Sequence, residues 1–227
     1  MIVAIDGPAG SGKSTTARRV AEALGGLYLD TGAMYRAVGL AFADRDLPLD
    51  EDAARDLVPA LDVRLDVRPA GLRVSLDGAD VTDRIRTPEA AELASRASAL
   101  APVRDAMSAL QRRVATDHVA ATGTPVVAEG RDMGTVVFPD AAVKFFLVAD
   151  LDARARRRLG DFAGSDADPA AFETVRADLA ARDARDTSRA LAPLRAAPDA
   201  VTLDTTALTI DAQVDRVLDA IRRTEPA

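Results

Sequence analysis

The sequence predicts an α/β fold of three layers, α/β/α, in which helices cover a five-stranded parallel core sheet. Apolar runs without alternation are typical of strands buried on both faces, and five occur, at residues 2–6, 27–30, 126–128, 143–149 and 200–203. Stretches with helical periodicity lie between them. Two runs between residues 63 and 83 alternate apolar and polar residues instead, which indicates a small inserted antiparallel sheet.

Local signals place the elements of the N-terminal part. The first strand leads directly into a glycine-rich stretch, residues 7–12, and a helical pattern then extends from Lys13 to about Leu24. The pair Gly25-Gly26 ends that helix, because glycine is a poor helix former. The elements expected next are a strand and two helices, at residues 27–30, 32–44 and 50–61.

The middle of the chain changes character. Residues 63–68 alternate with the period of a half-exposed strand, and a second alternating run over 72–76 ends at Asp77-Gly78, a dipeptide typical of hairpin turns. Helices resume at Thr87-Pro88, where a capping residue precedes a proline at the first helical position, and are expected to break at Pro102.

An Arg- and Asp-rich helical region then extends from residue 151 to about 190, with an interruption near residues 164–166. After the last strand, the final helix carries a single apolar stripe, which indicates one buried face. The stripe consists of Ile210, Val214, Val217, Leu218 and Ile221.

Composition narrows the class of protein. The chain has 227 residues, enough for one good core, and 48% hydrophobic content, which is typical of a globular protein. A net charge of −7 and only 4% aromatic residues disfavour a nucleic-acid-binding surface. The absence of cysteine excludes disulfides and a thiolate nucleophile, and the single histidine, His118, is expected on a helix surface. Because Met1 leads directly into the first strand and no apolar run can span a bilayer, we expect a cytoplasmic protein without a membrane partner.

Residues 7–14, GPAGSGKS, match the phosphate-loop (P-loop) pattern G-x-x-x-x-G-K-[ST] at every specified position. They lie between a buried strand and a helix, which is the structural context that this pattern requires. The glycines let backbone N–H groups turn toward a polyphosphate, and the start of the helix adds the positive end of its dipole. We expect Lys13 to reach the outer phosphates and Ser14 to ligate Mg²⁺. The sequence therefore predicts a protein that binds ATP or GTP.

A P-loop occurs in switch GTPases, motor ATPases and small-molecule kinases alike. The chain has neither the N-K-x-D pattern of guanine-binding proteins nor an LSGGQ-like transporter signature. It has arginines near strand ends and on helix faces instead: Arg36, Arg131, the stripe Arg154, Arg157 and Arg158, and the stripe Arg182, Arg185, Asp186 and Arg189. Each stripe alone is also what a solvated, salt-bridged face would show. Converging arginines, however, suit two phosphorylated substrates held end to end.

Several segments, in order over nearly the whole chain, resemble bacterial-type cytidylate kinases, which belong to the nucleoside monophosphate kinase group of P-loop proteins. The matching segments are GPAGSGKST (7–15), LDTGAMYR (29–36), IRTPE (85–89), EGRDMGTVVFPDA (129–141), RARRR (154–158) and RDARDTSRALAPL (182–194). The resemblance implies a P-loop NTPase-type core of about residues 1–30, 122–150 and 190–227, a monophosphate-binding subdomain with the antiparallel sheet at about 31–121, and a helical lid at about 151–189.

The resemblance also implies the roles of individual residues. ATP is bound by Gly7, Pro8, Ala9, Gly10, Ser11, Gly12, Lys13, Ser14 and Thr15, with Ser14 on Mg²⁺, and by Arg157 of the lid. The acceptor phosphate is held by Arg36, Arg131 and Arg189, its ribose by Arg182 and Asp186, and the cytosine edge by Ser95, Arg104 and Asp132. Thr31, Tyr35 and Gly130 complete the substrate-binding set, and the implied catalytic residues are Lys13, Arg131, Arg157 and Arg158.

The implied reaction is transfer of a phosphoryl group from ATP to CMP or dCMP with Mg²⁺ as cofactor, in a monomer because one chain supplies all the implied ligands. A monophosphate oxygen is already anionic, so the reaction needs no strong general base. A carboxylate that accepts from the cytosine amino group, next to an arginine that donates to the ring nitrogen and carbonyl, matches cytosine better than uracil.

Four alternatives stay open at this point. The protein is also compatible with a kinase for UMP or another small acceptor, or with a nucleotide-dependent switch that binds a partner. Ser98 competes with Ser95 for the same role. Glu129, at the tip of the strand at 126–128, suits a water-mediated contact to Mg²⁺ and a structural hydrogen bond equally well.

Overall fold

The structure, a computed structural model, describes residues 1–68, 71–163 and 169–224. Its contacts divide the chain into two compact units. Unit 1 consists of Met1–Tyr28 and Thr122–Ala227, and unit 2 of Leu29–Ala121. The functional division into core, subdomain and lid stays a prediction.

The core sheet has five strands in the order β2-β6-β1-β7-β8, and β1 pairs in parallel with both β6 and β7, as β7 does with β8. The predicted fold class is therefore confirmed. Together with the sheet, the elements of this part of the chain are β1 (Ile2–Asp6), α1 (Lys13–Ala23), β2 (Leu27–Asp30), β6 (Val126–Gly130), the π-helical turn η3 (Met133–Val137), β7 (Val143–Val148), α6 (Leu151–Ala163), α7 (Pro169–Ser188), β8 (Val201–Asp204) and α8 (Ile210–Thr224).

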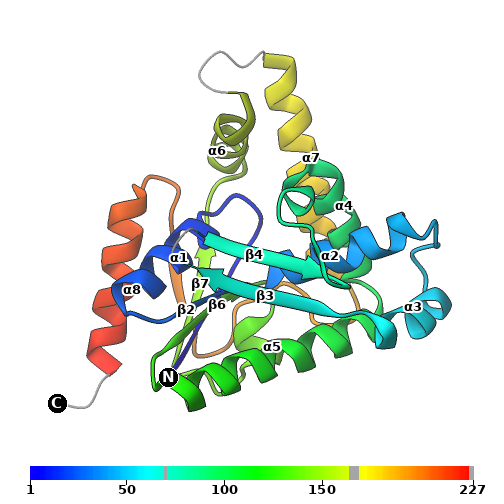
Figure 1. Ribbon diagram of the computed structural model, residues 1–227. Coiled ribbons are helices and arrows are strands. Elements are labelled where there is room, and N and C mark those ends of the chain that lie inside the picture. The colour runs from blue at the N-terminus through cyan, green and yellow to red at the C-terminus, as the bar shows by residue number, and fades with distance from the viewer. Residues whose placement is uncertain (69–70, 164–168, 225–227) are drawn as a thin grey trace. The chain divides into compact units, whose positions relative to one another are not determined.

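The core of unit 1 lies between the sheet and the helices α1 and α8. Val3 and Ile5 of β1, Phe145 of β7 and Val217 of α8 belong to one buried cluster, in which each is at most 2% exposed. The apolar stripe predicted for the final helix supplies α8's share of this cluster. The helices α6 and α7 of the same unit pack side by side (Figure 1).

Unit 2 holds the small antiparallel sheet, in the order β3-β4-β5, and the helix α2, which packs on β4 and α4. The turn between β4 and β5 is the predicted hairpin turn, where Asp77 and Gly78 have φ angles of 51° and 82°. The elements of unit 2 are α2 (Thr31–Asp44), α3 (Glu51–Leu57), η1 (Val58–Ala60), β3 (Val63–Arg68), β4 (Gly71–Leu76), β5 (Ala79–Asp80), η2 (Arg84–Arg86), α4 (Pro88–Ala97) and α5 (Ala101–Thr122).

Two expectations about helices need correction. The helix break expected at Pro102 lies slightly earlier, at residues 98–100 between α4 and α5, and Pro102 itself lies in the first turn of α5, where a proline has no hydrogen bond to lose. The helix expected over 50–61 ends as α3 at Leu57 and continues only as the 3₁₀ turn η1. The interruption expected near 164–166 and the turn at 69–70 lie outside the described residues.

None of the helices in the described ranges combines the length and the apolar character that crossing a bilayer requires.

Candidate active site

The P-loop connects β1 to α1 and has the backbone geometry that anion binding needs. Gly7 has a φ of 147°, and a Cβ there would lie 2.1 Å from the carbonyl oxygen of Leu147, so no other residue fits. The Ser11 hydroxyl donates to the carbonyl oxygen of Pro8 at 3.0 Å, which closes the loop on itself. Gly12 precedes α1 without a capping side chain, so the N–H groups at the start of α1 have no side-chain competitor for an anion.

Lys13, a residue of this loop and the first residue of α1, is only 5% exposed. Its Nζ donates to the carbonyl oxygen of Pro8 at 2.7 Å. Burial, together with the charges of Arg131 and Arg182, lowers the pKa of Lys13 to about 7, against an opposing effect of Glu129. Two guanidinium cations therefore repel the Lys13 ammonium group, and a bound phosphate would relieve this repulsion.

Glu129, the penultimate residue of β6, is buried beside the start of α1. Its Oε1 accepts hydrogen bonds from the Ser14 hydroxyl at 2.6 Å and from the Tyr28 hydroxyl at 3.0 Å. The structural hydrogen bond considered for Glu129 is therefore present. The same two oxygen-bearing side chains, Ser14 and Glu129, are ligand types that suit a hard cation such as Mg²⁺.

The turn after β6 carries Arg131 and Asp132 and is fixed from β1. Both oxygens of the Asp6 carboxylate accept backbone N–H groups, from Met133 and from Gly134, each at 2.8 Å. Burial raises the pKa of Asp6 to about 6 in spite of these two bonds, and the charge of Asp132 adds to the rise. Asp132 itself is 2% exposed at the start of η3. The strand β1 thus holds this turn in place.

The helix α7 presents Asp186 to the same turn. Its Oδ2 accepts from Nε of Arg131 at 2.8 Å, and Asp186 is 4% exposed. Burial favours a raised pKa for Asp186, but the charges of Arg131 and Arg182 and the hydrogen bond from Arg131 outweigh it, so that the pKa is lowered. Arg189 follows the end of α7, and its Nε donates to the carbonyl oxygen of Ala192 at 2.6 Å. The structure therefore brings Arg131, Arg182 and Asp186 together.

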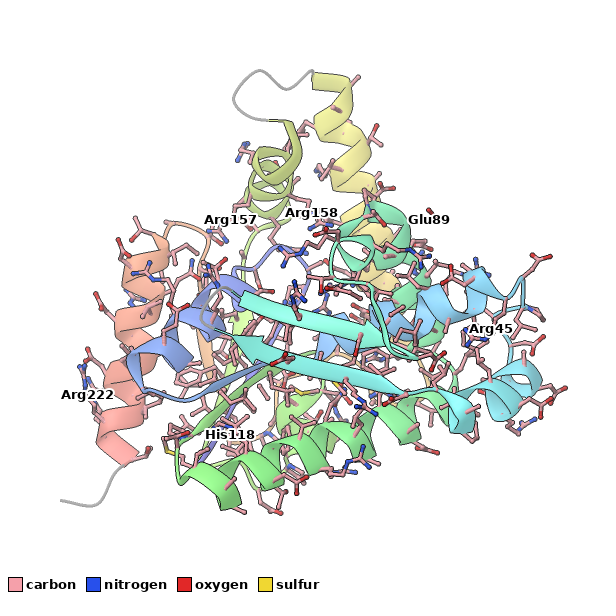
Figure 2. The ribbon with its side chains drawn as sticks, in the orientation of Figure 1. Arg45, Glu89, His118, Arg157, Arg158 and Arg222 are labelled. Atoms are coloured by element: carbon pink, nitrogen blue, oxygen red, sulfur yellow. The ribbon has the colours of Figure 1, made fainter. Side chains whose placement is uncertain are left out.

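Arg157 and Arg158 lie on α6 (Figure 2). The Arg157 guanidinium donates to the carbonyl oxygens of Thr205 and Thr206 and, at 3.2 Å, to the Thr205 hydroxyl. Arg157 thereby connects α6 to the loop between β8 and α8. The nucleotide contacts expected of Arg157 and Arg158 stay predictions.

In unit 2, the start of α2 places Arg36. The Asp30 side chain accepts from the backbone N–H of Ala33 at 2.9 Å, as an N-cap does, and from Nη2 of Arg36 at 3.1 Å. Gly32 leaves room for this pair, since a Cβ there would lie 3.3 Å from Nη1 of Arg36. Thr31, the first residue of α2, is 2% exposed, and Thr15 of unit 1 is half-buried on α1.

Tyr35 and Arg104, from α2 and α5, meet in unit 2. The Arg104 guanidinium lies 5.9 Å from the centroid of the Tyr35 ring, in a cation–π arrangement, and donates to the carbonyl oxygen of Ser98 at 3.3 Å. Ser95 is 8% exposed on α4. The Ser98 hydroxyl donates to the carbonyl oxygen of Ser95 at 3.0 Å, so its proton is already used within the helix end.

Sequence reasoning missed two buried residues that support the P-loop from the C-terminal segment. The Thr205 hydroxyl donates to the carbonyl oxygen of Ser11 at 2.9 Å. The Gln213 side chain accepts from the Thr16 hydroxyl at 2.9 Å, and its Oε1 would lie 2.6 Å from a Cβ at Gly12. Both Thr205 and Gln213 are about 190 residues or more from their partners, and no local pattern indicates such contacts.

The family model for cytidylate kinase matches residues 3–223 of the chain. The chain belongs to the cytidylate kinase family. A cytidylate kinase of Salinibacter ruber is 50% identical over 222 residues, which cover 98% of this chain and 97% of the relative. One of Carboxydothermus hydrogenoformans is 44% identical and covers 98% of each chain. The fold alone is shared with a solved protein of Eubacterium ventriosum, at 14% identity, a TM-score of 0.50 and 98% coverage of both chains.

Membership in the cytidylate kinase family makes this protein a kinase, that is, a phosphotransferase that uses ATP. That the P-loop of unit 1 binds the phosphates of ATP stays a prediction.

Proposed function

We propose that this cytidylate kinase transfers the γ-phosphoryl group of ATP to CMP and dCMP, which yields CDP and dCDP. The residue roles implied by the resemblance belong to this proposal, as do a monomeric state, a cytoplasmic location and the absence of a nucleic-acid partner. A switch protein is not favoured, because the family consists of kinases.

The observation that carries the proposal is that the buried Lys13 and the partly buried Arg131 of unit 1 both lie beside the charge of Glu129, and that the charge of Arg131 acts on Lys13. Lys13 belongs to the P-loop, and Arg131 to the turn expected to hold the acceptor phosphate. Their charges are close enough that Arg131 contributes to the low pKa of Lys13. Cations from the donor and acceptor sides that interact while buried suit two phosphates that meet between them. In phosphoryl transfer, such positioning and charge neutralisation supply most of the catalysis.

Mg²⁺ fits the residues of this region as a partner of ATP. Among the described residues, no three His, Cys, Asp or Glu side chains are grouped so that they could hold a metal ion. The chain offers Ser14 and Glu129, and an ion held with so few protein ligands relies on phosphate and water oxygens, as Mg²⁺ commonly does. Bound there, Mg²⁺ would neutralise charge on the transferring phosphate.

For the base, we propose that Asp132 accepts from the cytosine amino group and that Arg104 donates to the ring nitrogen or carbonyl. Both side chains are nearly buried, at 2% and 5% exposure, where a polar group discriminates strongly between ligands that do and do not pair with it.

A coupled assay of ADP release with CMP, dCMP, UMP, AMP and GMP as acceptors tests the function. We expect strong turnover with CMP and dCMP. Turnover with UMP or AMP but not with CMP would contradict the base assignment, and turnover with none of the five would contradict the kinase activity.

The variant Asp132→Ala tests the base assignment within the same assay. It should reduce kcat/KM for CMP far more than for UMP, by about 10-fold or more, because only the cytosine amino group loses its partner. An equal loss with both acceptors would show that Asp132 does not read the base.

A further inference from the structure

Arg154 of α6 has no part in the roles assigned above, yet it is one of the most connected side chains of unit 1. It is 7% exposed. Its Nε donates to the carbonyl oxygen of Ala149 at 3.0 Å, and its Nη1 donates to the carbonyl oxygen of Ala9 at 3.2 Å. The same Nη1 lies 2.6 Å from Oδ2 of Asp183. Because Ala9 belongs to the P-loop and Asp183 to α7, one guanidinium joins the two.

The backbone around this contact is closely packed. Ala9, Ala155 of α6 and Leu179 of α7 form a buried cluster, in which each is at most 9% exposed. A Cβ at Gly10 would lie 3.0 Å from Cβ of Arg154. The P-loop and α6 are therefore in direct contact. Because no gap separates them, a change in the conformation of the loop displaces or fixes the side chain of Arg154.

Asp183 faces cations on two sides. Its Oδ2 pairs with Arg154, while its charge also acts on the guanidinium of Arg131. Asp186 lies three residues after Asp183 and therefore on nearly the same face of α7. Its Oδ2 accepts a hydrogen bond from Nε of Arg131 at 2.8 Å. The helix α7 thus connects Arg154, which contacts the P-loop, to Arg131 of the proposed acceptor site.

We propose that Arg154 and Asp183 are positioning residues that couple the two substrate sites, so that an ATP-type ligand on the P-loop tightens binding of the acceptor monophosphate. This inference rests on the proposed function. A triphosphate orders the P-loop, the loop fixes Arg154 through Ala9, and Arg154 fixes α7 through Asp183. Arg131 and Asp186 are then already fixed when the acceptor binds, so binding of the acceptor costs less conformational entropy. By linkage, the acceptor tightens binding of the triphosphate by the same factor.

The test measures this coupling on the full-length protein. Isothermal titration calorimetry gives Kd for CMP alone and in saturating Mg²⁺ and β,γ-imido-ATP, a non-hydrolysable ATP analogue. In the unmodified protein we expect the analogue to lower Kd for CMP by about fivefold or more. In Asp183→Asn, which removes the charge but keeps the shape, this ratio should fall below about twofold. Asp178→Asn is the matched control, because Asp178 is an exposed residue of the same helix, and it should keep the unmodified ratio.

Arg154→Lys is the second variant and takes the place of Asp183→Asn if that protein does not fold, as judged by circular dichroism. Lysine keeps the charge but cannot make the three contacts of the guanidinium, so the ratio should fall again. A ratio near one in the unmodified protein, or an unchanged ratio in the variants, would overturn the inference. A purely structural role for the pair would lower the melting temperature of the variants and leave the ratio intact.

The proposed function is tested separately by turnover of the unmodified protein. Turnover with CMP together with an unchanged ratio in the variants contradicts the coupling alone. If another monophosphate is turned over in place of CMP, the base assignment fails and the ratio is measured with that acceptor. Turnover with no acceptor contradicts the proposed function and, with it, the inference that rests on it.

Discussion

The hydroxyl of Ser14 donates a hydrogen bond to Oε1 of Glu129 at 2.6 Å and so connects the start of α1 to the end of β6. The Tyr28 hydroxyl donates to the same oxygen, and Glu129 is 6% exposed. A carboxylate in such surroundings can orient Ser14 and also supply negative charge to a nearby cation. Its two roles are separable by experiment, because only one of them needs the charge.

The variant Glu129→Gln should raise the Mg²⁺ concentration needed for half-maximal turnover by about 10-fold, since an amide keeps an acceptor for Ser14 but loses the negative charge. Initial rates at fixed ATP and varied Mg²⁺ give this value. Tyr28→Phe is the control, because it removes a hydrogen bond to the carboxylate without removing charge, and it should change the requirement by less than about twofold. Identical Mg²⁺ dependence in Glu129→Gln and the unmodified protein would leave Glu129 with a structural role only.

Replacing Lys13 by methionine should abolish turnover with every acceptor and raise the free energy of unfolding. The pKa of Lys13 is about 7 in the folded protein, against 10.5 for an ordinary lysine. Between these two values the unfolded chain holds more protons than the folded one, so Lys13 makes the unmodified protein more stable as pH rises through this window. The gain in the free energy of unfolding of Lys13→Met over the unmodified protein should therefore be larger at pH 6 than at pH 9. Urea denaturation at both pH values measures this gain. A gain of the same size at both pH values would contradict the lowered pKa of Lys13.

Thr205 supports the P-loop through its hydroxyl, so removing that group should weaken ATP use. Thr205→Val keeps the shape of the side chain but removes the hydroxyl that donates to the Ser11 carbonyl oxygen and that accepts one of the hydrogen bonds of Arg157. We expect KM for ATP to rise by about 2–10-fold, the value of one hydrogen bond, with a smaller change in KM for CMP. Thr205→Ser restores the hydroxyl and should restore KM. Equal kinetics of the valine and serine variants would argue against the hydrogen bond.

Gln111 of α5 is fully buried, and neither polar atom of its amide has a hydrogen-bond partner among the residues that the structure describes. An unpaired buried amide is costly, so Gln111→Leu should raise the free energy of unfolding by about 1–3 kcal/mol. Thermal denaturation followed by circular dichroism measures the change, and Gln111→Glu, which buries a charge instead, should lower stability. A loss of stability in the leucine variant would mean that the amide is bound to water.

Local patterns predicted the parts of this protein that depend on neighbours in sequence. The eight-residue P-loop was identified because its geometry requires glycines, a lysine and a serine at fixed spacing. The hairpin at Asp77-Gly78 was identified for a similar reason. A proline such as Pro102 indicates a helix boundary but not its exact place. It can follow the end of one helix or lie in the first turn of the next, because the first backbone N–H groups of a helix need no partner within it.

The sequence by itself determined the fold class, the P-loop and, through resemblance, the family, because strand burial, helix periodicity and phosphate binding all depend on residues close together in the chain. Only the tertiary structure decided what surrounds the site. Three contacts join segments that are far apart in sequence. Thr205 bonds Ser11, Asp6 bonds the turn after β6, and Arg154 bonds both Ala9 and Asp183. Such contacts depend on the order of the strands in the sheet and on the packing of the helices against it. Neither can be predicted from the spacing of residues within a short segment.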